Sequence, residues 1–303
     1  MFVAGAARCG LIPLTPNMTG FSFAGQWYIE PGYADRMKEL IVPRLEAGKD
    51  PLPPSMFQGL PPIDRYAGAA RLSRNEQYVA DTFRNQDGVG ILPIKGAMSR
   101  NGEMCSYGND SLMRWLDILT RDEQTRAIVL DINSPGGTVD STRAFADAVR
   151  AANAIKPVVS WTPFAASAAY FVGSQGRELI VEDQLVGGVG SIGVLMVLTN
   201  QSAALEKQGI QVEILRADGS PDKALVNGVE PISDQTRAEL QDMLNACRNE
   251  FVGYVRRGRA GKLTSNEVFS GKMYTASDAV RLGLADRKGS RAQAIQRALQ
   301  LSK

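Results

Sequence analysis

From about Gly88 onward the chain alternates short apolar runs with segments in which apolar residues recur every three or four positions. Gly88–Lys95 predicts a first strand, and Asp110–Arg121 carries an apolar stripe at helical spacing. Ala127–Ile132 is almost wholly apolar, which is typical of a strand buried on both faces. The alternation predicts an α/β domain built from βαβ units with right-handed crossovers.

The same patterns predict the remaining elements. Further strands are expected over Pro157–Trp161, Leu179–Val181, Gly193–Leu198 and Val212–Leu215, with a bridge at Met273–Tyr274. Further helices are expected over Thr138–Ile155, Gln201–Gln208, Ser233–Arg257 and Ala276–Leu282, with a final helix from Arg291. Ser233 is a plausible cap for the longest of these helices.

The segment before Gly88 has a different texture, because it is rich in glycine and proline. It contains one amphipathic segment near Ala34–Leu45, followed by Pro51-Leu52-Pro53-Pro54 and a second proline pair. Such a stretch favours an extended connection, so a boundary is expected between Lys49 and Gly88. We therefore divide the chain into an N-terminal arm, residues 1–87, and an α/β domain, residues 88–303.

Composition places the chain among ordinary soluble globular proteins. It has 303 residues, of which 44% are hydrophobic and 22% charged, and its net charge of +2 arises from 34 basic and 32 acidic residues. This balance predicts no nucleic-acid partner. The longest apolar run, Leu185–Leu198, contains four glycines and is too short to span a membrane, and the N-terminus lacks a secretory pattern. A cytoplasmic protein without a membrane partner is expected.

The chain contains no histidine, which narrows the possible chemistry. A Ser-His-Asp triad, a Cys-His dyad and a histidine zinc site all need imidazole. Cys9, Cys105 and Cys247 are far apart and form no Cys-x-x-Cys pair, so we interpret them as reduced packing residues. No metal and no cofactor are expected.

One serine lies where a nucleophile could be mounted. Ser167 follows the strand Pro157–Trp161 and sits among small apolar neighbours at the predicted start of a buried helix. Free N–H groups at such a junction favour developing negative charge. The alternative interpretation is a small residue that lets the helix pack closely, and the local pattern does not decide between them.

Two glycine-rich stretches accompany this serine. Asn133–Gly137 lies at the carboxyl end of a buried strand, where ligands of α/β sheets bind. Gly136 and Gly137 could supply an oxyanion hole through their backbone N–H groups, or they could form only a tight turn. Gly187–Gly193 has no Gly-Lys-Ser/Thr sequence after it, which argues against a phosphate loop and favours backbone crowding near a site.

Without imidazole, a serine nucleophile needs a lysine or a carboxylate as its base. A lysine can act when burial lowers its pKa by several units from about 10.4. Among the lysines, Lys95 ends the first strand and Lys223 lies in a polar loop after Leu215. Spacing alone does not choose between these two.

Taken in order, several motifs resemble the signal peptide peptidase A family of serine–lysine peptidases. The motifs are Asp131-Ile132-Asn133-Ser134-Pro135-Gly136-Gly137, Ala166-Ser167, Gly190-Ser191-Ile192-Gly193 and Lys223. The likeness spans about Gly88–Asp286. Within that family, the segments Ala203–Gly209 and Ile29–Ala34 are similar to lambda-type phage head-maturation proteases.

This resemblance implies a ClpP/crotonase-like fold and a serine endopeptidase. It implies Ser167 as nucleophile, Lys223 as base and Ser191 as the residue that orients the lysine, with backbone N–H groups of Gly136, Gly137 and Ala168 as the oxyanion hole. Two departures are that Ala168 and the next residue stand where the family usually has glycines, and that the lead-in to Lys223 is one residue longer.

The resemblance to phage proteases also implies partners. Substrates would be capsid assembly proteins, namely scaffold, portal and the protease itself, processed in the host cytoplasm or inside the prohead. A homo-oligomer is implied because family members assemble as rings. Two rival hypotheses are a catalytically silent protein that binds capsid or scaffold, and a crotonase-like acyl-CoA enzyme, which typically uses carboxylates as acid and base. Asp131 and Asp140 are close in sequence to the Ser-Pro-Gly-Gly turn, but no carboxylate flanks it in an obvious catalytic place.

Overall fold

The computed structural model describes residues 27–29, 72–103 and 106–303. Its strands are β1 (Trp27–Ile29), β2 (Val89–Lys95), β3 (Gly102–Glu103), β4 (Ser106–Tyr107), β5 (Ala127–Ser134), β6 (Gly136–Thr138), β7 (Val158–Ala166), β8 (Glu178–Val181), β9 (Gly188–Gly190), β10 (Met273–Tyr274) and β11 (Arg287–Lys288). Its helices are α2 (Arg74–Phe83), α3 (Asn109–Arg121), α4 (Thr142–Ile155), α5 (Ala168–Gly173), α6 (Ser202–Lys207), α7 (Asp234–Gly258), α8 (Ala276–Arg281) and α9 (Arg291–Leu301), with a 3-10 helix at Asn266–Ser270.

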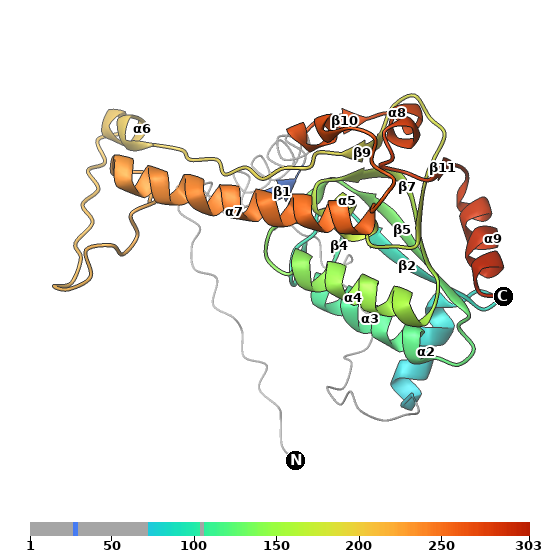
Figure 1. Cartoon of the computed structure of the whole chain (residues 1–303). Helices are drawn as coiled ribbons and strands as arrows, with labels where there is room; N and C mark the ends of the chain where they lie inside the picture. The colour runs from blue at the N-terminus through green and yellow to red at the C-terminus, as the bar shows by residue number, and fades with distance from the viewer. Residues whose placement is uncertain (1–26, 30–71, 104–105) are drawn as a thin grey trace, which may run out of the picture.

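A mainly parallel sheet forms the centre of the molecule (Figure 1). Its main path runs β10-β9-β7-β5-β2, in which only the β10–β9 pair is antiparallel. The first half of β7 pairs with β8, which in turn pairs with β11, and the last three residues of β7 pair with β9. One edge of β7 therefore pairs with two different strands, with β8 along its first half and with β9 at its carboxyl end.

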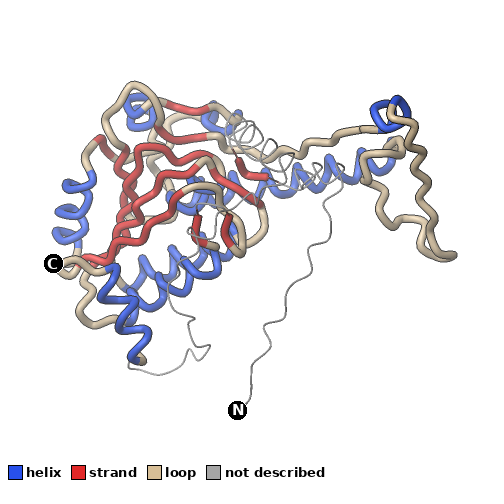
Figure 2. The backbone as a smooth tube through the Cα atoms, turned by 180° about the vertical axis from the view of Figure 1, so that it is seen from behind, coloured by secondary structure: helices blue, strands red, loops and turns tan. Residues whose placement is uncertain are grey.

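Helices cover both faces of this sheet (Figures 1 and 2). On one face α2, α3, α4, α5 and α7 contribute to the main core, which includes Leu130, Ile132 and Phe171. On the other face α9 packs through Ala294 and Ala298 against a smaller apolar cluster. Successive residues of β5 point to opposite faces, so a buried strand of this kind must be apolar throughout.

Residues 194–233 run away from the sheet and its covering helices, beside the exposed part of α7 (Figures 1 and 2). We call this segment the extension. It exposes several large apolar side chains, among them Leu215 at 85%. The buried residues of α7 are Thr236 near its start and a group from Phe251 to Val255. The residues between them are exposed or half-buried, and among these Cys247 packs against the main core.

Several predicted elements differ from the structure. Residues 136–138 form a strand, and the helix predicted from Thr138 begins at Thr142, because Gly136 adopts φ +93° and turns the chain back into extended backbone. The strand after Leu179–Val181 is β9, which precedes the predicted Gly193–Leu198. Val212–Leu215 forms no strand, because no strand of the described residues lies beside it in the extension.

Helix α2, which precedes Gly88, contributes to the same core as the sheet. Helix α2 is capped by a reciprocal pair of hydrogen bonds between Ser73 and Glu76, and its Val79 and Ala80 belong to the main core. The sequence pattern missed this helix because it carries few apolar residues. The predicted helix near Ala34–Leu45 and the proline runs lie outside the described residues.

Two further points concern predictions made from composition. Cys247 is half-buried, and burial raises the pKa of its thiol; Cys9 and Cys105 lie outside the described residues. In the described part of the chain, we find no helix with both the length and the apolar character needed to cross a bilayer.

Candidate active site

The two serines singled out in the sequence lie side by side at the carboxyl end of the sheet. Ala166, the last residue of β7, pairs with Gly190, the last residue of β9, and each is followed directly by one of the serines. The Ser167 N–H donates to the Gly190 carbonyl at 2.8 Å. The Ser191 N–H donates to the Lys272 carbonyl at 2.8 Å, which fixes the end of β9 from its other side.

Ser167 occupies a strained turn between a strand and a helix. Its φ of 54° and ψ of −119° fall in a region that residues other than glycine rarely adopt. It lies just before α5, all six residues of which are buried, and its hydroxyl makes no capping hydrogen bond to that helix. Such strain clusters at functional sites, and a strand–turn–helix elbow is one way to present a nucleophilic serine.

Helix α5 is held firmly, so the position of Ser167 is fixed. The Tyr170 hydroxyl donates to the Leu284 carbonyl at 2.9 Å, and burial raises the pKa of that phenol above its usual range. The Phe171 ring contacts the Phe251 and Tyr254 rings of α7. This small helix therefore links the serine to α7 and to the C-terminal part of the chain.

The turn at Asn133–Gly137, which we call the glycine turn, was predicted as a candidate oxyanion hole. It lies beside Ser167. Ser134, at the end of β5, pairs with Ala165 of β7. Gly136 comes two positions after Ser134, and Ser167 comes two positions after Ala165. The two residues therefore lie at the same end of the sheet, where their strands end. Helix α5 packs against β6. The Gly136 N–H donates to the Ser134 hydroxyl at 3.2 Å, and that hydroxyl donates to the Gly96 carbonyl at 2.6 Å.

Gly137 presents its polar groups to the opposite edge of β6. The Met98 N–H donates to the Gly136 carbonyl and the Thr138 N–H donates to the Met98 carbonyl, both at 2.8 Å. Neighbouring residues of a strand present their N–H and C=O groups to opposite edges, so those of Gly137 point away from Met98. A Cβ on Gly137 would overlap the Met98 carbonyl oxygen and lie 2.5 Å from its carbon, so no larger residue fits here.

The second glycine run is crowded, as the sequence predicted. A Cβ on Gly188 would overlap the Tyr274 carbonyl oxygen, and one on Gly190 would lie against the Lys272 carbonyl oxygen. Both glycines also have positive φ. Glycine is therefore needed here so that β10 can approach β9 closely and hold Ser191 in place.

The lysine predicted as the base lies in another part of the chain. Lys223 is exposed and belongs to the extension, which runs away from the sheet (Figure 1). Its backbone carbonyl accepts from the Arg216 side chain at 2.7 Å, and its N–H donates to the Ser220 carbonyl. Within one chain the structure thus brings Ser167, Ser191 and the glycine turn together and leaves Lys223 apart.

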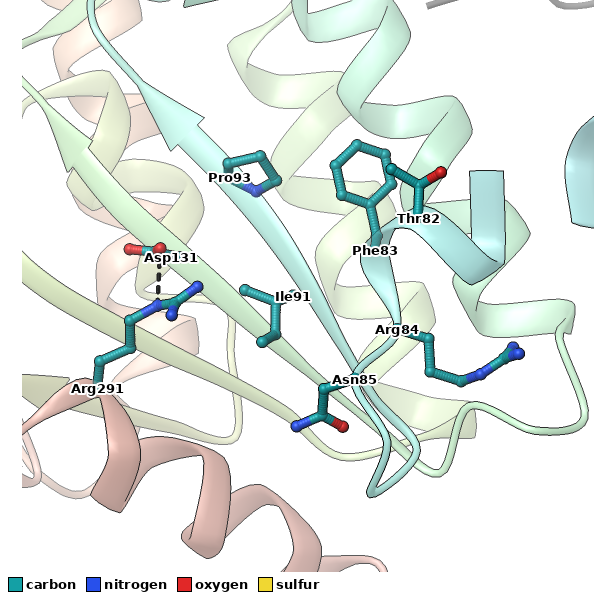
Figure 3. A pocket seen from close by; sticks show the side chains of 8 residues that line it. All are labelled: Thr82, Phe83, Arg84, Asn85, Ile91, Pro93, Asp131 and Arg291. Carbon is teal, nitrogen blue, oxygen red and sulfur yellow. Dashed lines mark hydrogen bonds and ion pairs between the residues drawn. The ribbon is translucent and has the colours of Figure 1, made fainter. Parts of the chain in front are cut away.

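The rival lysine is engaged elsewhere. The Lys95 Nζ lies 2.5 Å from one Asp131 carboxylate oxygen, and the Arg291 Nε donates to the other at 3.0 Å. Figure 3 shows Asp131 and Arg291 lining a pocket with Ile91 and Pro93, on the side of the sheet covered by α9. The amine of Lys95 is therefore already engaged in an ion pair with Asp131.

The carboxylates that a crotonase-like enzyme would need are also bound by arginines. Asp131 is held as described, and Asp140 accepts two hydrogen bonds from Arg100, at 2.6 and 2.8 Å. The Arg100 hydrogen bond and charge lower the pKa of Asp140. Both carboxylates are therefore occupied by ion pairs with arginines.

Two features of this region were not found from the sequence. One is Met98, whose backbone holds β6 through two hydrogen bonds. A methionine side chain does not mark a catalytic or binding site in a sequence. The other is the pairing of β1, from the N-terminal arm, with β6. Both depend on contacts between segments far apart in the chain, which local patterns do not reveal.

Comparison with protein families matches two models to this chain. The model for peptidase family S49 matches residues 150–303, and the model for Clp protease matches residues 84–179. Together they cover the sheet, both serines and the extension. These matches confirm the family resemblance and the Clp-like α/β fold expected from the sequence.

Individual relatives point the same way. A protein of Methanocaldococcus jannaschii is 31% identical over 189 residues, covering 62% of this chain and 60% of its own length. Capsid assembly protease C of Escherichia phage lambda is 27% identical over 218 residues, covering 68% of this chain and 48% of its own length. The match therefore spans about half the length of these relatives.

Among solved structures, a mutant of the 1510-N membrane-bound stomatin-specific protease superposes with a TM-score of 0.44 and 13% sequence identity. The superposition covers 71% of this chain and 85% of that one.

Proposed function

Because the chain belongs to peptidase family S49, we propose that it is a serine endopeptidase with Ser167 as nucleophile and Lys223 as base. The observation that carries the proposal is the strained elbow at Ser167, at the carboxyl end of β7 and beside the glycine turn. A residue held in that backbone conformation stores strain without an evident structural benefit. Presentation of its hydroxyl to a substrate accounts for it.

The chemistry follows from the groups present. A neutral lysine amine takes the proton of the Ser167 hydroxyl while the oxygen attacks the peptide carbonyl. The lysine then gives that proton to the leaving amine, and an acyl-enzyme ester remains on Ser167. Water, deprotonated by the same lysine, hydrolyses the ester and restores the serine.

Two backbone donors suit the oxyanion of this reaction. Gly137 points its N–H away from Met98, toward the edge of β6 at which β1 pairs in this structure. Ala168 is the first residue of α5, and N–H groups in a first helical turn lack partners within the helix. Gly136, the third predicted donor, already gives its N–H to Ser134. We therefore assign the oxyanion to Gly137 and Ala168, with Gly136 shaping the turn.

We infer that the lysine comes from a neighbouring copy of the chain. Lys223 belongs to the extension, which runs away from the sheet at whose carboxyl end Ser167 lies. The extension and the loop before β9 expose Leu185, Val186 and Leu215 at 84% or more, and such apolar surface marks an interaction site. A homo-oligomer would bury this surface, remove water from the lysine and so favour its neutral form.

The substrates we propose are capsid assembly proteins of a phage, including scaffold and portal, cleaved in the host cytoplasm or within the prohead. The proposal is supported by the similarity to capsid assembly protease C of phage lambda and to the head-tail preconnector protein GP5 of Enterobacteria phage P21. Cleavage of its own chain belongs to the same proposal.

Mixing two inactive variants tests the dyad and its assembly together. Ser167→Ala and Lys223→Ala should each lose peptidase activity, and Ser167→Ala should also lose labelling by a fluorophosphonate probe. If each site combines residues of two copies, co-refolded equimolar variants should regain about one quarter of wild-type activity, since half the serines and half the lysines are intact. Activity in Ser167→Ala alone would refute the nucleophile.

The matched control is Lys207→Ala, which removes a second lysine of the extension and should leave activity unchanged. A mixture that stays inactive although both variants assemble would refute the dyad between copies. Lys223→Arg should not restore activity, because a guanidinium remains protonated.

A further inference from the structure

The N-terminal arm contributes one strand to the candidate site. Strand β1 pairs antiparallel with β6, with Trp27 opposite Thr138, Tyr28 opposite Gly137 and Ile29 opposite Gly136. More than a hundred residues separate these two segments in the sequence. The pairing therefore places a piece of the arm directly on the glycine turn beside Ser167.

The pairing occupies the edge of β6 from which Gly137 presents its polar groups. Met98 takes up the other edge through Gly136 and Thr138, so the N–H and C=O of Gly137 are directed at Tyr28. The N–H of Gly137 is also one of the two proposed oxyanion donors. When β1 is paired in this position, the Gly137 N–H faces the backbone of Tyr28 and is not available to a substrate oxyanion.

The same edge is the natural place for a peptide substrate. An extended peptide binds an open strand by adding another strand, with the main chain supplying the hydrogen bonds. The edge of β6 lies beside Ser167, because Gly136 and Ser167 leave the sheet together and α5 packs on β6. A peptide cannot add to this edge while β1 is paired there.

We propose that β1 is an internal inhibitor, a substrate-like strand of the arm that must leave β6 before a peptide can be cleaved. The inference rests on the proposed peptidase function and adds its regulation. A two-stranded ladder of three residues is marginal by itself, so β1 can be displaced. Because it is part of the same chain, it nevertheless competes at a high effective concentration.

Proline substitution tests the pairing at one defined backbone position. Tyr28→Pro removes the N–H that faces Gly137 and should release β1. Ile29→Pro is the matched control, since neighbouring residues alternate and the N–H of Ile29 points away from β6. Both variants are made in the full chain, and neither changes a residue of the proposed catalytic machinery.

Two measurements separate the inhibitory role from the peptidase function. The first is the rate at which a fluorophosphonate probe and a reporter peptide react at Ser167, expected to rise about tenfold in Tyr28→Pro and to stay at the wild-type value in Ile29→Pro. The second is amide hydrogen exchange in β6. Gly136 and Thr138 donate within the domain, so only the amide of Gly137 should exchange faster in Tyr28→Pro.

The outcomes are distinct. Faster reaction together with faster Gly137 exchange supports the proposal. A wild-type reaction rate despite faster exchange overturns the inhibitory role and leaves the peptidase function standing, and unchanged exchange overturns the pairing itself. Failure of Ser167 to react in the wild type and in both variants overturns the peptidase function, and the inhibitory role with it.

Discussion

Replacing Gly137 by alanine tests whether the geometry of the glycine turn is as tight as described. The new Cβ would overlap the Met98 carbonyl oxygen and lie 2.5 Å from its carbon and 2.6 Å from its nitrogen. All three atoms are backbone, so no side-chain rotation can relieve the overlap. The two segments must move apart, which breaks the hydrogen bonds that Met98 makes with Gly136 and Thr138.

The cost can be estimated from these contacts. Each lost hydrogen bond costs about 1 kcal/mol, and overpacking adds about 1–3 kcal/mol. We expect Gly137→Ala to lose about 3–5 kcal/mol of unfolding free energy and its melting temperature to fall by roughly 10 °C. Because the oxyanion donor moves with the turn, the rate of fluorophosphonate labelling should fall about 100-fold or more.

Gly253→Ala is the matched control for the same substitution. Gly253 lies exposed within α7, and a Cβ there meets no atom within 4 Å. Alanine favours a helix over glycine, so this variant should gain about 0.5–1 kcal/mol. Urea unfolding of both variants measures the difference. If Gly137→Ala unfolds within about 1 kcal/mol of wild type and labels at the wild-type rate, the turn is not packed as described and our account of β6 is wrong.

Two further predictions concern the base and the fold. Ser191→Ala should lower peptidase activity less than Ser167→Ala does, because it removes a group that orients the lysine and leaves both reacting groups in place; equal losses in a kinetic assay would contradict these roles. Asp286→Asn should cost about 3–5 kcal/mol at pH 7, because Arg259 is 1% exposed and loses its charged partner. Burial raises the pKa of Asp286, but Arg259 lowers it further, so the net shift is downward. The pair therefore stabilises the fold above about pH 4 and is lost as pH falls through the lowered pKa. Urea unfolding between pH 7 and pH 3 should show a shallower loss in Asp286→Asn than in wild type, and parallel curves would refute the pairing.

The sequence determined the elements whose patterns are local. Strands β2, β5 and β8, helices α3 and α7, and the place of Ser167 after a buried strand all follow from apolar spacing and capping residues, because neighbours at two, three or four positions decide which face of an element is buried. The absence of histidine likewise limits the chemistry that the chain can perform, whatever its fold. The crowding around Gly188 and Gly190 was indicated by the glycine-rich sequence of residues 187–193.

Only the tertiary structure decided which segments meet. It made a strand of Gly136–Thr138, where the sequence predicted the start of a helix, because Met98 and β1 are available there as partners. It placed α2 in the core through Val79 and Ala80 despite a weak pattern. It also carried the extension, which contains Lys223, away from the sheet. Hydrogen bonds across a sheet and contacts between distant segments depend on the path of the whole chain, and local spacing does not encode that path.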